Sequence, residues 1–310
     1  MEYVQLGSSE YLISRLGLGC WALGGHGYGI VDDRDSIAMI REAVDFGVNF
    51  FDTADTYGFG HSESVIAKAL GGSRQNMVIA TKFGVRWDDT GVFGKDISPS
   101  YLVEALENSL RRLKMEKLPL YQIHWPDGKT KIEDTMAALV RCQEAGKIDQ
   151  IGCCNVSIMD IDAAQNIAPL SSYQCRYNLV DRNSFRMAEK LHREYKITIL
   201  PYEVLGRGLF SGKHKQGDSF GKADTRQVDP NFSDKNLYKM KNLLNLLTVI
   251  GNKHGVKPAQ VAICWVLGQE FVGSALVGCK TVEQLSENIA ATQFQLEVED
   301  RAALNEIVTM

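Results

Sequence analysis

The sequence lacks the features of membrane-spanning, secreted and nucleic-acid-binding proteins. No apolar run approaches the ~18 residues that a membrane-spanning helix requires. The first residues, Met-Glu-Tyr-Val-Gln-Leu-Gly, do not place a charged segment ahead of an apolar one, so we expect no secretory signal. No long basic run occurs and the formal net charge is −4, which argues against a nucleic-acid-binding or membrane-binding surface.

Patterns for disulfides and metal sites are missing as well. The seven cysteines are odd in number and include no Cys-x-x-Cys pair, and the histidines have no spaced partners. We therefore expect reduced, buried thiols in a cytoplasmic protein and no bound metal. The adjacent pair Cys153 and Cys154 suggests a redox switch, but two thiols on a buried strand are usually inert.

What is present is a regular alternation of short apolar strands and amphipathic helices. The strands show no polar alternation, which is typical of parallel sheets buried on both faces. Eight such strands predict an α/β protein with a (β/α)8 TIM barrel, which we take as one domain over residues 1–310. The expected strands are 15–19, 49–52, 77–82, 120–123, 150–153, 172–175, 198–202 and 273–277. The alternative is a doubly wound sheet, which would need a Gly-rich phosphate turn after its first strand, and the glycines there make no Gly-x-Gly-x-x-Gly.

Helical spacing and capping residues place helices between these strands. The expected helices are 33–46, 63–70, 98–113, 132–145, 157–168, 183–195, 234–254, 258–267 and 281–291. A β-hairpin over 3–14 precedes the barrel, and an extra C-terminal helix over 298–308 follows it. Residues 206–234 are too polar for core and too long for an ordinary loop, so they are either a functional lid or disordered.

Four polar residues stand at the ends of adjacent predicted strands: Asp52 and Tyr57, then Lys82, then His124. In a barrel the reactive groups lie at the carboxyl ends of the strands, so these side chains are expected to meet. Tyr57 would act as a general acid, with its pKa lowered by Lys82, which Asp52 holds. His124 would orient the substrate oxygen. None of these groups is an obvious nucleophile, so a hydride would have to come from a cofactor.

Each of these residues also has an interpretation without catalysis. Asp52 and Lys82 could form a buried ion pair that closes the barrel rim, and His124 alone could be a hydrogen-bonded rim histidine. All four in register at neighbouring strand ends favour catalysis.

The sequence resembles the aldo-keto reductase family. Among the matching stretches are Phe-Phe-Asp-Thr-Ala-Asp-Thr-Tyr-Gly at 50–58, Leu-Tyr-Gln-Ile-His-Trp-Pro-Asp at 120–127 and Leu-Gly-Arg-Gly-Leu-Phe-Ser-Gly-Lys at 205–213. Others lie at 16–25, 62–63, 80–82, 146–148, 151–155, 174–178 and 287–288, so the resemblance covers nearly the whole chain.

The resemblance implies a (β/α)8 barrel and an NADPH-dependent enzyme that reduces an aldehyde or ketone, with Asp52, Tyr57, Lys82 and His124 as the catalytic tetrad. Lys280 resembles the basic residue that meets the 2′-phosphate, which favours NADP(H). The same site could run in reverse as a dehydrogenase of sugars or alcohols. A third possibility is a regulatory subunit that binds NADP(H) with little turnover.

The family comparison also implies a set of residues around the cofactor. These are Gly19, Cys20, Trp21, Asp52, Cys154, Asn155, Gln174, Tyr202, Leu205, Gly206, Arg207, Gly278, Lys280, Gln284, Glu287 and Asn288. The sequence departs from the family pattern at several positions, among them Pro119, Cys154 and Glu203. Cys154 replaces the usual serine, and a thiol is a weaker hydrogen-bond donor. Glu203 lies near the expected pyrophosphate, where its charge is unfavourable unless it faces a cation.

The resemblance implies a small-molecule carbonyl compound as the substrate, and aromatic residues are expected to line its pocket. The candidates are Trp21, Tyr28, Trp87, Trp125 and Phe232. The predicted loop 83–98 carries Arg86, Asp88, Asp89 and Lys95, a polarity that would suit a hydroxylated substrate such as a keto-sugar, although scattered surface charge would look the same.

Overall fold

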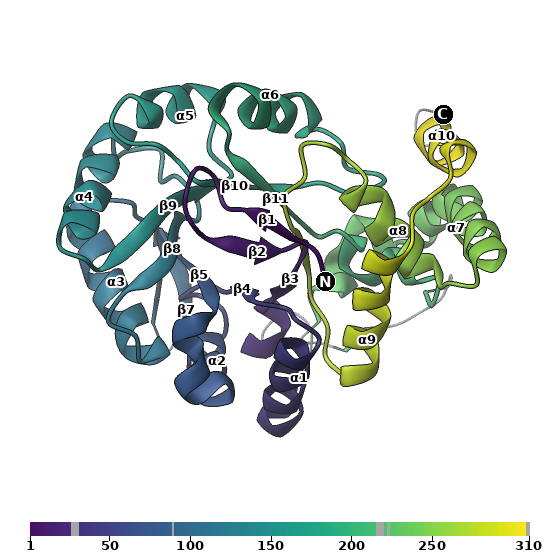
Figure 1. Cartoon of the computed structure of the whole chain (residues 1–310), viewed down its shortest axis with the longest axis horizontal. Helices are drawn as coiled ribbons and strands as arrows, with labels where there is room; N and C mark the ends of the chain where they lie inside the picture. The colour runs from purple at the N-terminus through teal and green to yellow at the C-terminus, as the bar shows by residue number, and fades with distance from the viewer. Residues whose placement is uncertain (26–30, 89, 215–219, 222–223, 308–310) are drawn as a thin grey trace.

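Eight short apolar segments form the parallel strands of one sheet, which curls into a barrel (Figure 1). The computed structural model describes residues 1–25, 31–88, 90–214, 220–221 and 224–307. The barrel strands are β3 (Leu16–Gly19), β4 (Phe50–Asp52), β5 (Val78–Phe83), β8 (Leu118–Ile123), β9 (Ile148–Cys154), β10 (Ser172–Arg176), β11 (Thr198–Tyr202) and β12 (Ala275–Val277). A parallel bridge between Ile199 and Val272 joins β11 to the approach of β12 and closes the barrel. The predicted (β/α)8 fold is confirmed.

Helices follow the strands around the outside of the barrel (Figure 1). Those of the described ranges are α1 (Asp33–Asp45), α2 (His61–Leu70), α3 (Pro99–Leu113), α4 (Ile132–Glu144), α5 (Ile158–Gln165), α6 (Phe185–Tyr195), α7 (Asp234–His254), α8 (Pro258–Leu267), α9 (Val282–Ala290) and α10 (Val298–Glu306). Two starts are set by serine caps. Ser98 accepts a hydrogen bond from the Tyr101 backbone ahead of Pro99, and Ser157 forms a capping box with Asp160. The extra C-terminal helix is present as α10.

The barrel interior changes from apolar to polar along its axis. At the bottom, apolar side chains from several strands pack together, among them Phe50, Ala80, Leu120 and Leu200. Because side chains alternate along a strand, the next inward position lies two residues further on. Those positions are Asp52, Lys82, Gln122 and Tyr202, and they form the upper layer of the barrel.

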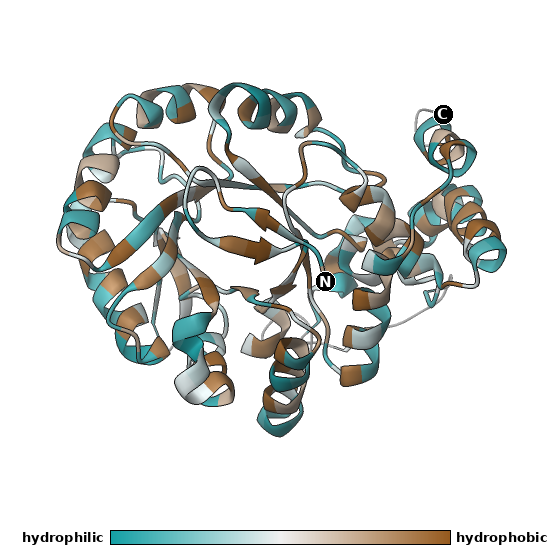
Figure 2. Ribbon diagram, in the orientation of Figure 1, coloured by the Kyte–Doolittle hydropathy of each residue, from teal (hydrophilic) through white to brown (hydrophobic). Residues whose placement is uncertain are grey.

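The N-terminal hairpin covers the bottom of the barrel. Its strands are β1 (Tyr3–Gln5) and β2 (Leu12–Ser14), and Figure 1 shows them across the barrel centre. Leu6 and Ile13 are fully buried and belong to the apolar layer inside the barrel. A second, larger core lies between the strands and the helices, and Figure 2 shows the strands coloured largely as hydrophobic. All seven cysteines are buried and free, and Trp265 of α8 is buried in the larger core.

Two segments that were expected to be irregular have local structure. Residues 83–98 contain an antiparallel hairpin, β6 (Val85–Asp88) with β7 (Gly91–Lys95). The described parts of 206–234 form the 3₁₀ turns η3 (Gly206–Ser211), η4 (Thr225–Val228) and η5 (Pro230–Phe232). Further 3₁₀ turns are η1 (Trp21–Gly24), η2 (Gly71–Asn76) and η6 (Ala291–Gln293). Within the ranges that the structure describes, no helix has both the length and the apolar character that crossing a membrane requires.

A close backbone approach joins η1 to the turn that carries Tyr57. Gly58 has a φ of +61°, and a Cβ built on it would lie 2.2 Å from the Gly24 carbonyl oxygen. Only glycine tolerates both the left-handed backbone and this approach. The contact between Gly24 and Gly58 therefore fixes the position of the turn that carries Tyr57.

We expect Gly58→Ala to lower the free energy of unfolding by about 1–3 kcal/mol and to reduce activity, because the turn must shift. Thermal unfolding and initial rates measure both effects. Gly72→Ala is the matched control, since nothing lies within 4 Å of a Cβ at this exposed position. Equal stability of the two variants would contradict the argument.

Candidate active site

The upper layer of the barrel is built around Lys82, whose side chain is 1% exposed. Its Nζ donates to Asp52 Oδ2 at 2.7 Å and to the Thr53 carbonyl oxygen at 2.7 Å. The third contact is with the Tyr57 hydroxyl at 3.4 Å. Three donors of one ammonium group are thus used, which a buried cation requires.

Two glutamines complete the coordination of Asp52. Its Oδ1 accepts from Gln122 Nε2 at 3.3 Å and from Gln174 Nε2. Gln174 Nε2 also lies 3.2 Å from Gln122 Oε1, and Ser172 donates to that same oxygen. The role of Gln122, which faces inward from the strand that precedes His124, was missed by the sequence analysis. Its signal was its position, two residues before His124 and level with Lys82 on the neighbouring strand.

The direction of the Tyr57 pKa shift differs from the expectation. Burial raises the pKa of Tyr57 well above its usual value, and Lys82 only partly offsets this. For Lys82, burial alone would lower the pKa, but Asp52 and Tyr57 reverse the direction and the net shift is upward. At neutral pH the site therefore holds a protonated phenol beside an ammonium group. A phenol in that state can donate a proton.

His124 completes the group at the strand ends. Its ring centre lies 5.9 Å from that of Tyr57 in an edge-to-face arrangement. Burial, together with the charges of Lys82 and Lys95, holds the His124 pKa well below its usual value, so the imidazole is neutral. Its Nδ1 is buried without a hydrogen-bond partner in the described structure. Asn155 donates to the His124 carbonyl oxygen at 3.1 Å and accepts from the Tyr202 hydroxyl at 2.9 Å.

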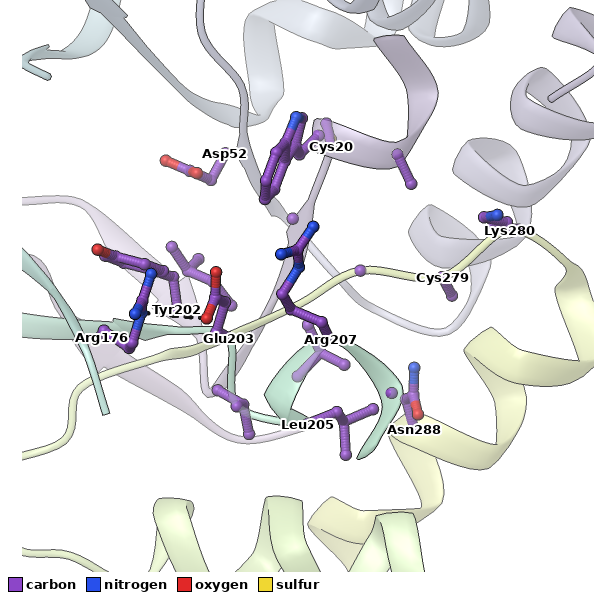
Figure 3. A pocket seen from close by; sticks show the side chains of 18 of the residues that line it. Cys20, Asp52, Arg176, Tyr202, Glu203, Leu205, Arg207, Cys279, Lys280 and Asn288 are labelled. Atoms are coloured by element: carbon purple, nitrogen blue, oxygen red, sulfur yellow. Dashed lines mark ion pairs between the residues drawn. The ribbon is translucent and has the colours of Figure 1, made fainter. Parts of the chain in front are cut away.

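A cavity of about 690 Å³ extends from these residues along the carboxyl ends of β10, β11 and β12 to α9. Asp52, Tyr57 and His124 line what we call its catalytic end, and Lys82 lies beneath them. Every residue that the family comparison placed around a cofactor lines the cavity, except Gly206. Figure 3 shows side chains that line the cavity and labels ten of them, including Asp52, Tyr202, Arg207, Lys280 and Asn288.

The middle of the cavity carries paired charges. Arg176 Nε lies 3.0 Å from Glu203 Oε2, and Arg207 pairs with Asp229 at 2.9 Å (Figure 3 draws the first pair). Glu203 therefore faces a cation, which resolves the concern about its charge. Arg207 also lies over the Trp21 ring, 5.6 Å from its centre. Both Glu203 and Arg207 hold left-handed backbone conformations, as does Asn155, and such strain is concentrated at functional sites.

The far end of the cavity is basic. Lys213, Arg226, Lys257 and Lys280 line what we call the basic end. Arg226 forms an ion pair with Asp224 at 2.6 Å. The pKa of Lys280 is lowered, mainly by burial and then by the positive charge of Arg226. Only Lys280 was predicted here, since the other three come from the polar 206–234 segment and the start of α8.

The predicted substrate residues divide into three groups. Trp21 and Trp125 line the catalytic end, together with Val85 of the β6–β7 hairpin. Trp87 and Phe232 do not line the cavity. Trp87 packs against Phe59 with ring centres 5.6 Å apart, and Phe232 packs against Phe220 and borders a separate cavity of about 390 Å³. Tyr28 lies outside the described residues.

Comparison with known proteins identifies the family of this chain. The sequence pattern of the "Aldo/keto reductase family" matches residues 15–309. The chain belongs to the aldo/keto reductase family. It is therefore an oxidoreductase that uses a nicotinamide cofactor.

Individual relatives agree with this assignment over nearly their whole length. The chain is 35% identical to aldo-keto reductase YhdN of Bacillus subtilis, with 99% of this chain and 94% of the relative covered. It is 34% identical to aldo-keto reductase yakc [NADP(+)] of Schizosaccharomyces pombe, covering 92% and 85%. The structure superimposes on the glycerol dehydrogenase AKR11B4 from Gluconobacter oxydans with a TM-score of 0.91, at 33% identity and covering 99% and 95%.

Behind the active site of this aldo/keto reductase lies a second buried charge cluster that the sequence analysis missed. Glu63 is fully buried, pairs with Arg112 at 2.6 Å and accepts from Thr81 at 2.6 Å. Asp55 is 2% exposed, and its Oδ1 has no hydrogen-bond partner in the described structure. Burial, and then Glu63, raises the pKa of Asp55 to about 8, although a hydrogen bond from Trp87 opposes the shift.

This cluster makes stability depend on pH. Because the folded-state pKa of Asp55 lies above its usual value of 3.8, the native protein keeps a proton that the unfolded chain has released. The stability that this proton contributes is present at low pH and is lost as pH rises towards about 8.

We expect Asp55→Asn, which cannot titrate, to lose less stability than the wild type between roughly pH 6 and pH 9. The difference in Tm between the variant and the wild type should grow by about 2–4 °C across this range. Thermal unfolding at several pH values measures it, with the exposed Asp45→Asn as control. Parallel Tm curves for Asp55→Asn and wild type would show that Asp55 does not titrate in this window.

Proposed function

We propose that this protein is an NADPH-dependent reductase that converts an aldehyde or ketone to the alcohol, with Tyr57 as the proton donor. The observation that carries the proposal is the contact of a protonated Tyr57 hydroxyl with the Lys82–Asp52 ion pair at the catalytic end of the cavity. Proton donation to a carbonyl oxygen is the chemistry that this arrangement supports best.

The cavity fits NADP(H) by the chemistry of its lining. At the catalytic end, Asn155 and Gln174 offer amide groups suited to the carboxamide of a nicotinamide. Arg207, in the middle, would bind a pyrophosphate, and the basic end would bind the 2′-phosphate of NADP(H). Glu287 and Asn288 of α9 would contact the adenosine. When bound, this cofactor supplies the hydride for the carbonyl carbon.

The side chains of the catalytic end carry the proton. Tyr57 donates its phenolic proton to the carbonyl oxygen, leaving a phenolate that Lys82 stabilises through its positive charge. Asp52 keeps Lys82 charged and in place. The neutral His124 is a hydrogen-bonding group for the same carbonyl oxygen and orients it towards Tyr57. The phenolate regains a proton from water after the alcohol leaves.

A second candidate is the reverse reaction, oxidation of an alcohol. The similarity to a glycerol dehydrogenase favours it, and the same residues would then act as base instead of acid. A keto-sugar is a candidate substrate in the reducing direction and a sugar alcohol in the other. Initial rates in both directions with keto-sugars, aromatic aldehydes and polyols decide between them. Absence of turnover in the whole panel, with tight NADPH binding retained, would instead support a regulatory role.

We expect Tyr57→Phe to lower kcat by about 10²–10⁴-fold, because the proton donor is lost, while NADPH binding stays within about twofold. Stopped-assay turnover and quenching of protein fluorescence by NADPH measure the two effects. Tyr238→Phe is the control, since Tyr238 lies exposed on α7. Full turnover by a Tyr57→Phe variant that still binds NADPH would overturn the proposed mechanism.

Cofactor preference tests the basic end separately. Lys280→Gln and Arg226→Gln are each expected to raise the KM for NADPH about 5- to 20-fold and to leave the KM for NADH nearly unchanged, because only NADPH carries the additional phosphate. Lys239→Gln on the exposed face of α7 is the control. An equal rise in KM for the two cofactors would mean that the basic end does not read the 2′-phosphate.

A further inference from the structure

The β6–β7 hairpin places a cation beside the catalytic end. Lys95 is the last residue of β7, and its Nζ lies 4.5 Å from the centre of the Trp125 ring. Trp125 lines the cavity next to His124 and is 36% exposed, so one part of its ring is open to solvent. An ammonium group over an indole face is held by the ring quadrupole, which leaves its charge available to other groups.

Lys95 differs from the neighbouring cations in that none of the described carboxylates pairs with it. Arg86, on the opposite strand of the hairpin, lies 3.4 Å from Asp96 and 4.0 Å from Glu104. Arg112 pairs with Glu63. Among the residues that the structure describes, no carboxylate lies within 4.0 Å of Lys95 Nζ.

The carboxylates at and near the catalytic end are already used. Asp52 accepts from Lys82, and Glu203 pairs with Arg176. On this side of the catalytic end, Lys95 is therefore a cation whose charge no described carboxylate neutralises. His124 responds to that charge, because Lys95 contributes, after burial and Lys82, to the low pKa of this imidazole. The geometry agrees, since the Trp125 ring that Lys95 covers has its centre 6.4 Å from that of His124.

Lys95 itself does not line the cavity but contacts Trp125, which does, and the other described charges of the hairpin make contacts away from it. Asp88 accepts hydrogen bonds from Thr90 within the turn, and the Arg86 guanidinium lies 4.7 Å from the Tyr101 ring centre. Neither residue lines the cavity, whereas Val85, Trp21 and Trp125 do. As far as the described residues go, the wall that a substrate meets here is apolar and aromatic, and the Lys95 ammonium group lies at its edge on the Trp125 ring.

We propose that Lys95 and the Trp125 ring form a subsite for a carboxylate on the substrate, so that this enzyme prefers planar or aromatic aldehydes and ketones that carry one negative charge. This proposal rests on the proposed carbonyl reduction. The ring of the substrate would stack on the aromatic wall, the carbonyl would face Tyr57 and His124, and the carboxylate would lie against Lys95.

The test compares substrates that differ only in charge. 3-Formylbenzoate and 4-formylbenzoate are each paired with the matching formylbenzamide, which has nearly the same shape and no charge. Wild type is expected to favour the benzoates in kcat/KM. In Lys95→Met this preference should fall about 3- to 10-fold through a rise in KM for the benzoates alone, and Lys95→Arg should restore most of it. Lys129→Met removes an exposed lysine of the same rim that does not line the cavity, and should leave the preference unchanged.

Ionic strength and direct binding provide readouts apart from turnover. Raising the salt concentration should increase the KM for the benzoates in wild type and have little effect in Lys95→Met, because an exposed ion pair is screened. Quenching of tryptophan fluorescence by each aldehyde gives binding constants even without reduction. A wild type that does not distinguish benzoate from benzamide in binding, or a Lys95→Met variant with an unchanged ratio, would overturn the subsite. Selective benzoate binding without reduction of any aldehyde would support the subsite and overturn the proposed function instead.

Discussion

The buried ion pair between Lys82 and Asp52 is the interaction on which the rest of the site depends. Both side chains are at most 5% exposed, and taking two charges out of water costs several kcal/mol for each ion. The cost is offset because all three Lys82 donors and both Asp52 oxygens find partners: Thr53, Gln122, Gln174 and Tyr57 surround the pair. Removing either charge would leave the other buried and unpaired, which typically destabilises a protein by about 3–5 kcal/mol.

This requirement explains the layering of the barrel. The apolar layer at the bottom of the barrel, which the N-terminal hairpin covers, keeps water away from that side of the ion pair. The ion pair lies buried in the polar layer above it. The register of β4, β5 and β8 places Asp52, Lys82 and Gln122 at successive positions around the same rim. A shift of one residue in any of these strands would turn its polar side chain towards the helices, because side chains alternate along a strand. The fold and the active site therefore depend on the same register.

Along the cavity, charge is arranged in three regions. In the middle, the opposite charges within the pairs Arg176–Glu203 and Arg207–Asp229 neutralise each other. The far end is basic, and Lys95 lies beside the catalytic end. A cleft with positive charge at both ends concentrates anions and orients them before they touch the protein. The neutral His124 between Lys82 and Lys95 fits this arrangement, since a third positive charge there would be unfavourable.

Much of the architecture was predictable because it depends on local patterns. Short apolar runs without alternation indicated eight buried parallel strands, and serine caps such as Ser98 and Ser157 marked helix starts that the structure retains. The position of Asp52, Lys82 and His124 at strand ends followed from the same pattern. The hairpin at 85–95 was missed, since its sequence is polar and glycine-containing and its Val92 and Phe93 are exposed.

What the sequence determined by itself was the strand and helix pattern and the chemical types at the strand ends, because alternation, capping and residue chemistry act over a few positions. Tertiary structure alone decided which charges meet. Glu203 pairs with Arg176, which is 27 positions away in the chain. Asp55 lies near Glu63, 8 positions away, and Lys95 contacts Trp125, 30 positions away. It also decided the direction of the Tyr57 pKa, because the burial that raises it comes from the whole barrel and outweighs the neighbouring ammonium group that the sequence could indicate.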